Sequence, residues 1–164
     1  MTKPQRYRVL GVDPGLNITG YGIVDFASSA RGPAIVEGGA IRTDSKADVA
    51  RRIEQIHAEL TELIEEFRPN LVAIENLYAH YAHPRTSILM AHARGVILLA
   101  AQQAGVTVRG LAATKVKKSL TGNGHATKLQ IQRAIQAVYK LESLPEPPDV
   151  ADALAIALCA GRQM

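Results

Sequence analysis

Four carboxylates stand where apolar segments begin or end, which is where a fold can bring acidic side chains together. Asp13 and Glu75 each follow a short apolar run, and Asp149 and Asp152 lie three residues apart at the start of an apolar C-terminal segment. If the strands ending in Asp13 and Glu75 are parallel neighbours, their carboxylates lie about 5 Å apart at one edge of the sheet. A hard divalent cation such as Mg²⁺ is the simplest bridge between two such charges. The pattern therefore predicts a metal site.

Each carboxylate also has a plainer interpretation. Asp13 opens an Asp-Pro-Gly sequence, which is ordinary turn chemistry, and a single Glu after a strand is commonly a surface residue. Asp149 and Asp152 would complement the dipole at the start of a helix. The metal hypothesis rests on the four occurring together.

The first half of the chain predicts the elements that position Asp13 and Glu75. Pro14-Gly15 turns the chain between two antiparallel strands, and a third strand is expected at residues 34–42. Asp44-Ser45 is a helix-start signal, and apolar residues then recur at helical spacing as far as Phe67. The continuous apolar run at residues 71–74 is typical of a strand covered on both faces, parallel to the first strand.

The second half predicts helices around one more strand. Thr86-Ser87 is expected to cap a long helix that ends at Gly105, and residues 106–110 form the last strand. Further helices are expected at residues 114–120 and 128–141, and Pro148 fits the first turn of a final helix. The fold class is α/β: a mixed five-stranded sheet, with three antiparallel strands and then two parallel ones, flanked by helices.

Composition indicates one domain, spanning residues 1–164. The chain has 47% hydrophobic residues, which is enough for one sizeable core, and it has no long Pro/Gly/Ser linker. No segment predicts a signal peptide or a membrane span, so we expect a cytoplasmic protein. The single cysteine, Cys159, excludes disulfides within the chain and cysteine-ligated zinc, so any metal is held mainly by oxygen.

Charge is distributed unevenly along the chain, whose formal net charge is +4. Residues 76–141 contain no Asp or Glu and carry nine Lys and Arg residues, which predicts a polyanionic partner. The alternative is a solvated basic face. The basic candidates for nucleic-acid contact are Lys115, Lys117, Lys118, Lys128 and Arg133.

The loop after Glu75 carries two aromatic residues, Tyr78 and Tyr81, beside the expected site. They are candidates for stacking on an exposed base, and packing within the loop is the alternative. His80 and His83 have an HxxH spacing, but no other nitrogen or sulfur ligands lie nearby, which argues against zinc.

Four motifs together resemble the RuvC family of Holliday-junction resolvases, over essentially the whole chain. The motifs are GVDPGLNITGYG at residues 11–22, AIENLY at 73–78, AHARGV at 91–96 and DVADALAIA at 149–157. The resemblance implies an RNase H-like fold and a homodimeric endonuclease that nicks four-way DNA junctions in recombination and repair. It implies two Mg²⁺ ions per subunit, for which Mn²⁺ may substitute, and a partnership with the branch-migration complex RuvA–RuvB.

The same resemblance assigns roles by motif. It makes Asp13, Glu75, Asp149 and Asp152 the metal-binding catalytic acids, with Asp149 less fixed because some members have His there. Tyr78 matches an aromatic residue that inserts near the junction, and Lys117 and Lys128 match lysines that contact DNA.

Two other functions remain open. The first hairpin also resembles the phosphate loop of actin-like ATPases and sugar kinases, although these need two such domains. A second alternative is a module that binds DNA without cutting it, although such a module gains nothing from an acidic cluster.

The long helix predicts a dimer. Residues 88–101 are apolar around more of the helix than one sheet covers, and Ala91, Ala93 and Gly95 would let a second helix approach closely. A junction with near-twofold symmetry requires two matched nicks, which a symmetric dimer provides.

Overall fold

A single mixed sheet organises the protein. The computed structural model describes residues 6–27, 31–78 and 82–164, and the strand order in its sheet is β3-β2-β1-β4-β5. The strands are β1 (Arg6–Asp13), β2 (Ile18–Ala27), β3 (Ala34–Arg42), β4 (Leu71–Glu75) and β5 (Thr107–Leu111). β1, β2 and β3 are antiparallel, and β4 is parallel to both β1 and β5. The predicted fold class and strand directions are confirmed.

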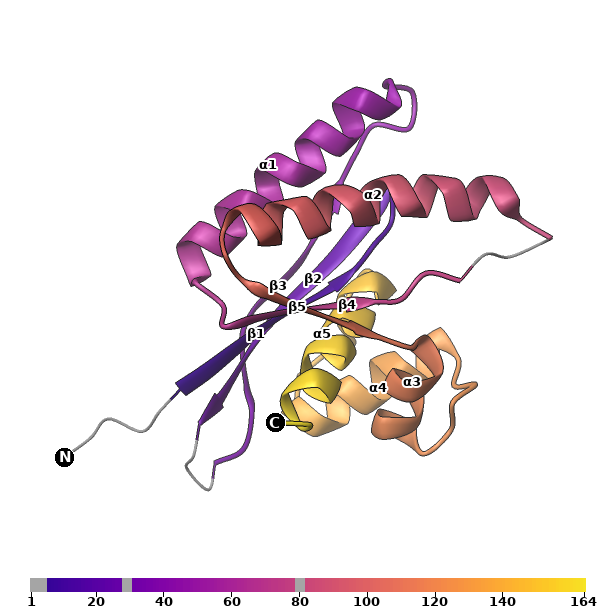
Figure 1. The fold of residues 1–164 in the computed structure, drawn as a ribbon. Helices are drawn as coiled ribbons and strands as arrows, with labels where there is room; N and C mark the ends of the chain where they lie inside the picture. Colours follow the sequence, from indigo (N-terminus) through magenta and orange to yellow (C-terminus); the bar gives the residue numbers. More distant parts are fainter. Residues whose placement is uncertain (1–5, 28–30, 79–81) are drawn as a thin grey trace.

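Helices cover the two faces of this sheet in separate layers. Helices α1 (Val49–Phe67) and α2 (Pro84–Gln103) cover one face, and α5 (Pro148–Gly161) lies on the other (Figure 1). Helices α3 (Ala113–Thr121) and α4 (Lys128–Tyr139) pack against α5. None of the helices in the described part of the chain is both long enough and apolar enough to cross a membrane.

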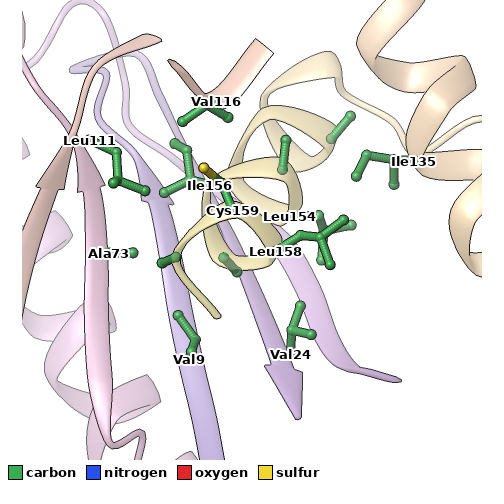
Figure 2. Packing of buried hydrophobic residues seen from close by; sticks show 14 of the residues in the cluster. Val9, Val24, Ala73, Leu111, Val116, Ile135, Leu154, Ile156, Leu158 and Cys159 are labelled. Atoms are coloured by element: carbon green, nitrogen blue, oxygen red, sulfur yellow. The ribbon is translucent and has the colours of Figure 1, made fainter. Parts of the chain in front are cut away.

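Helix α5 lies in close contact with the strands beneath it. Val150, Ala151 and every residue from 153 to 161 are buried, and Figure 2 shows α5 between the strands and the side chains of α3 and α4. A Cβ added to Gly11 would lie 2.2 Å from the carbonyl oxygen of Ala153, so β1 and α5 meet backbone to backbone. The helix can lie this close only because glycine has no side chain.

Helices α1 and α2 pack on the other face of the sheet through their side chains. Leu10, Ile56, Leu60 and Ile97 are fully buried there, in a second core cluster. Arg52 is the exception among the buried residues of α1, which are otherwise apolar. It stands four residues before Ile56 and is also buried.

Three predicted helix boundaries are wrong. Helix α1 begins at Val49 rather than at Asp44-Ser45, because Asp44 forms a turn in which its side chain accepts from the backbone N–H of Lys46 at 2.9 Å. Helix α2 begins at Pro84, a residue suited to a first turn, so Thr86-Ser87 lies inside the helix. Helix α4 ends at Tyr139, where Lys140 takes a left-handed backbone conformation (φ 53°), rather than at Leu141.

The prediction for Ala93 is also wrong. Ala93 is fully buried in the protein's own core, so it is not available to a second subunit. Ala91 and Gly95 are exposed, as are Ile88 and Leu99, so the outward face of α2 carries apolar and small residues, with the exposed His92 beside them.

Candidate active site

The ends of β1 and β4 bring the first two carboxylates together. Val12 pairs with Ile74 in the parallel ladder, so the next position on each strand places Asp13 beside Glu75. The two carboxyl groups lie close enough for each to shift the pKa of the other. The predicted adjacency of Asp13 and Glu75 is therefore confirmed.

A glycine contact brings the first turn of α5 to the same edge. Asp13 pairs with Gly20 across the hairpin, and a Cβ on Gly20 would lie 2.1 Å from the carbonyl oxygen of Asp149. The absence of this Cβ lets the N-terminal turn of α5 rest directly on β2. The structure thereby explains how Asp149 and Asp152, more than 130 residues along the chain, reach Asp13.

One pocket of about 360 Å³ collects the predicted acids. All four carboxylates line it, together with Lys117 and Lys128, the turn residues Pro14 and Gly15, and an apolar wall that includes Val116, Ile131 and Ile156. The pocket thus combines a negative cluster with two cations at its side.

Burial and repulsion raise the pKa values of three of these carboxyl groups, namely Asp13, Glu75 and Asp152. Burial, followed by the charges of Asp152, Glu75 and Asp149, raises the pKa of Asp13 to about 9. Burial also raises the pKa of Asp152 to about 6, although the charge of Lys128 acts in the opposite direction. The pKa of Glu75 is raised by burial, against the hydrogen bond from Asp13 and the charges of Lys117 and Lys128. Burial and repulsion therefore favour a proton shared by Asp13 and Glu75.

The donor set fits a hard cation. All four acidic side chains offer oxygen only, and a divalent ion would replace the shared proton and relieve the repulsion. In the described part of the chain, no three His, Cys, Asp or Glu side chains already converge on one point as metal ligands do. Side chains that share a pocket but repel one another are expected to stand apart in this way.

The basic candidates divide into two groups. Lys117 and Lys128 line the pocket, whereas Lys115 donates to the side chain of Gln163 at 3.2 Å, near the other end of α5. Lys118 and Arg133 are exposed outside the pocket lining. Their contact with DNA stays a prediction.

The two tyrosines of the loop after Glu75 have different standing. Tyr78 is 66% exposed, which leaves its ring accessible for stacking, and Tyr81 and His80 lie outside the described residues. The stacking role of both tyrosines stays a prediction.

Residues 76–141, which contain no Asp or Glu, do not form one face of the protein. Arg85 and Arg94 belong to α2 on one side of the sheet, and Lys117 and Lys128 belong to α3 and α4 on the other (Figure 1). The edge strand β5 connects α2 to α3 and so links these two groups. Sequence distance thus grouped charges that the fold separates.

A second pocket, of about 550 Å³, adjoins the first and was not predicted. Pro14, Glu75 and Met90 line both pockets, and Leu77 and Tyr78 add apolar surface to the second. Arg94, which lies in the AHARGV motif and also lines the second pocket, donates through Nε to the carbonyl oxygen of Glu75 at 3.3 Å. It therefore holds the end of β4 from the α2 side, a role visible only once α2 is placed over that edge.

Comparison with known proteins gives the family. The profile described as "Crossover junction endodeoxyribonuclease RuvC" matches residues 9–160. The chain belongs to the RuvC family. It is 48% identical over 153 residues to RuvC of Rhodopirellula baltica, covering 92% of this chain and 84% of that relative. RuvC of Pelotomaculum thermopropionicum is 41% identical over 151 residues, covering 92% and 90%.

Solved structures of the family share the fold. The Thermus thermophilus RuvC structure matches with a TM-score of 0.83 at 32% identity, covering 94% of this chain and 93% of that one. T. thermophilus RuvC in complex with a Holliday junction substrate matches with a TM-score of 0.85 at 33% identity and the same coverage. The RNase H-like fold implied by the sequence motifs is therefore confirmed.

Proposed function

We propose that the protein is a structure-selective endonuclease that resolves four-way DNA junctions by paired, metal-dependent phosphodiester hydrolysis during recombination and repair. The observation that carries the proposal is the single pocket lined by Asp13, Glu75, Asp149, Asp152 and two lysines, in a chain of the RuvC family. The relatives are named crossover junction endodeoxyribonucleases, and a family member has been solved with a Holliday junction substrate.

The acids would act as oxygen ligands. Two Mg²⁺ ions, or Mn²⁺ in their place, would lower the pKa of the attacking water and stabilise charge on the leaving 3′ oxygen. Asp13 is the candidate shared ligand because its carboxyl is coupled electrostatically to the other three. Glu75, Asp149 and Asp152 would complete the set from β4 and α5, and the products would carry 5′-phosphate and 3′-hydroxyl ends.

Lys117 and Lys128 would orient the scissile phosphate. Both line the pocket, and the charges of both lower the pKa of Glu75 and of Asp152, so their positive charge acts where the phosphate would enter. Lys115, Lys118 and Arg133 would bind the DNA backbone farther out, and Tyr78 would stack on an exposed base.

One experiment separates this function from its alternatives. The protein is incubated with a four-way junction, with linear duplex and with ATP, each with Mg²⁺ or with chelator. We expect paired nicks in the junction, only with the metal. A module that only binds DNA would bind the junction without cutting it, and an ATPase would release phosphate.

We further propose that two copies pair through the outward face of α2. Ile88 is 58% exposed and Leu99 is 49% exposed on this face, and Ala91 and Gly95 offer little side-chain bulk between them. A second copy would remove this apolar stripe from water and place a second pocket for the opposite strand.

Gly95→Glu tests the dimer without disturbing the monomer core. A Cβ at Gly95 meets no atom within 4 Å, so the added side chain projects into open space within one subunit. We expect sedimentation to show a dimer for the wild type and for the control Ala58→Glu, an exposed site on α1, and a monomer with poor paired cutting for Gly95→Glu. A wild-type monomer, free and on the junction, would contradict the proposal.

Three further expectations complete the proposal. Residues 1–164 form one nuclease domain, which the single sheet with helices on both faces supports. The enzyme works in the cytoplasm and alongside the branch-migration complex RuvA–RuvB, as the family resemblance implies.

A further inference from the structure

Arg52 is a buried cation in the α1/α2 layer. It is 7% exposed, and Thr19 and Gln132 are the other buried polar side chains in the described part of the chain. Among the described residues, the salt bridges are those of Arg6 and Arg8 with Asp25, so Arg52 has no carboxylate partner there. Burying a charge without an opposite charge costs free energy. The neutral hydrogen-bond partners of Arg52 therefore indicate its role.

The partners of Arg52 hold the turn that follows Asp13. Arg52 donates through Nε to the hydroxyl oxygen of Thr43 at 2.9 Å and through Nη2 to the side-chain oxygen of Asn17. The Thr43 hydroxyl donates in turn to the carbonyl oxygen of Leu16 at 2.5 Å, and the backbone N–H of Thr43 donates to the carbonyl oxygen of Asn17 at 3.1 Å. One guanidinium thus ties residues 16 and 17 to α1 and to the segment after β3.

The same turn is fixed from its other side by Thr19. Thr19 is fully buried, and its hydroxyl donates to the carbonyl oxygen of Gly15 at 2.6 Å. Pro14 and Gly15, directly after Asp13, line the carboxylate pocket. The turn therefore has its catalytic side toward the pocket and its anchored side toward Arg52.

We propose that Arg52 is a positioning residue for the nuclease reaction, which fixes the turn at residues 14–17 and through it the Asp13 carboxylate. This inference rests on the proposed function. A planar guanidinium suits the task because its donors reach two acceptors at a fixed angle, whereas a lysine ammonium is a flexible point charge. Displacement of the turn moves a ligand rather than a DNA contact, so the chemical step changes and junction affinity does not.

The test compares variants from both sides of the network. Arg52→Met removes both hydrogen bonds, Arg52→Lys retains one donor, and Asn17→Ala removes one acceptor at an exposed position where folding is not at risk. Arg51→Met is the matched control, because Arg51 is the exposed neighbour on the same helix. Single-turnover cleavage, junction affinity and amide hydrogen exchange of residues 15–19 without metal or DNA are measured for each.

We expect Arg52→Met to slow single-turnover cleavage about 10- to 100-fold, the scale of a small misplacement of a catalytic group. Junction affinity should stay within about twofold, Arg52→Lys should recover part of the rate, and Arg51→Met should match the wild type. Combining Asn17→Ala with Arg52→Met should cost less than the two separate losses together, because both act on one turn.

The hydrogen-exchange readout keeps this inference distinct from the function on which it rests. Faster exchange at residues 15–19 in Arg52→Met and Asn17→Ala is expected even if the wild type cuts no junction, an outcome that would refute the proposed function alone. Unchanged exchange in Asn17→Ala, or full cleavage rates in Asn17→Ala and in folded Arg52→Met, would overturn the positioning role.

Discussion

The two faces of the sheet are built by different means, and only one of them supplies catalytic candidates from a helix. On the α5 face, glycines on β1 and β2 let the backbone of α5 lie directly against the strands, as Gly20 does against Asp149. On the α1/α2 face, large side chains such as Leu60 and Ile97 keep the helices at ordinary packing distance. Backbone contact therefore fixes the distance between α5 and the sheet. On the other face, the packing of side chains fixes the positions of α1 and α2.

This difference separates what each layer contributes. A shift of α5 moves Asp149 and Asp152 directly, because they lie in its first turns against the sheet. A gap in the α1/α2 core costs burial energy but leaves the β1, β4 and α5 backbones in place. Changes at the contact between α5 and the strands should alter the reaction, and truncations in the apolar core under α1 and α2 should alter stability. Arg52 is the exception in that second layer, because its hydrogen bonds hold the turn after Asp13.

Gly20→Ala should have the largest effect on the reaction. Its new Cβ would overlap the carbonyl oxygen of Asp149, so the first turn of α5 must move, and cleavage should fall at least about 100-fold. Gly38→Ala is the control on the neighbouring strand, because its Cβ would lie 3.3 Å from a methyl group of Val150, which can shift. Single-turnover rates on the junction measure both. Equal rates for the two variants would mean that α5 does not set the site.

Leu60→Ala should do the reverse. Leu60 is fully buried in the α1/α2 core, and truncation of such a side chain costs about 2–5 kcal/mol of unfolding free energy. Urea unfolding should show this loss, while the cleavage rate per folded molecule stays near that of the wild type. A Leu60→Ala protein that keeps its stability but loses its cleavage rate would contradict the distinction between the two faces.

The same contrast explains which features could be predicted from the sequence. Strands ending in Asp13 and Glu75 follow local signals, namely short apolar runs with turn residues beside them, and their parallel pairing follows from the helix between them. The inward face of α2 does not follow from the pattern, because this helix is apolar around its circumference, and Ala93 was therefore assigned to the wrong side.

Two other features depend on tertiary contacts. Thr86-Ser87 had cap-like residue types, but Pro84 allowed an earlier start, and local propensity does not decide between them. Arg52 carried a usable signal, since it occupies the buried stripe of α1 four residues before Ile56. Its partners Asn17 and Thr43 are set by the hairpin and by β3, which periodicity in α1 does not reveal.

Burial of the acids, together with their mutual repulsion, should make the stability of the carboxylate pocket depend on pH. The folded pKa values of Asp13, about 9, and Asp152, about 6, lie above the ordinary Asp value of 3.8, so folding binds protons and metal-free stability falls as pH rises through this range. Asp13→Asn should therefore raise the melting temperature in chelator at pH 8 by about 3–5 °C, the equivalent of one pKa unit in a domain of this size.

The same variant should show a much smaller gain at pH 4, where Asp13 is protonated in the folded wild type and only about half ionised in the unfolded chain. Glu54→Gln, an exposed carboxylate on α1, should show no such pH-dependent gain. Thermal unfolding of the three proteins at both pH values decides the matter, and an Asp13→Asn protein less stable than the wild type at pH 8 would contradict the repulsion argument.

Phosphate contacts should give the smallest effect and should again distinguish the two layers. Lys117→Ala and Lys128→Ala should each weaken junction binding and reduce the slope of log affinity against log salt by about one unit. Arg51→Ala removes an exposed cation from α1 and should leave the slope unchanged. Salt titrations of junction binding supply the values, and unchanged slopes in both lysine variants would place the DNA elsewhere.

Junction cleavage and junction binding by Asp13→Asn test whether the carboxylate pocket is the catalytic centre. Loss of this carboxylate weakens metal binding and also reduces the repulsion of phosphate. We therefore expect no detectable junction cutting with Mg²⁺. The affinity for the junction should be equal to that of the wild type or tighter. Wild-type cutting by a folded Asp13→Asn protein would contradict the assignment of the carboxylate pocket as the catalytic centre.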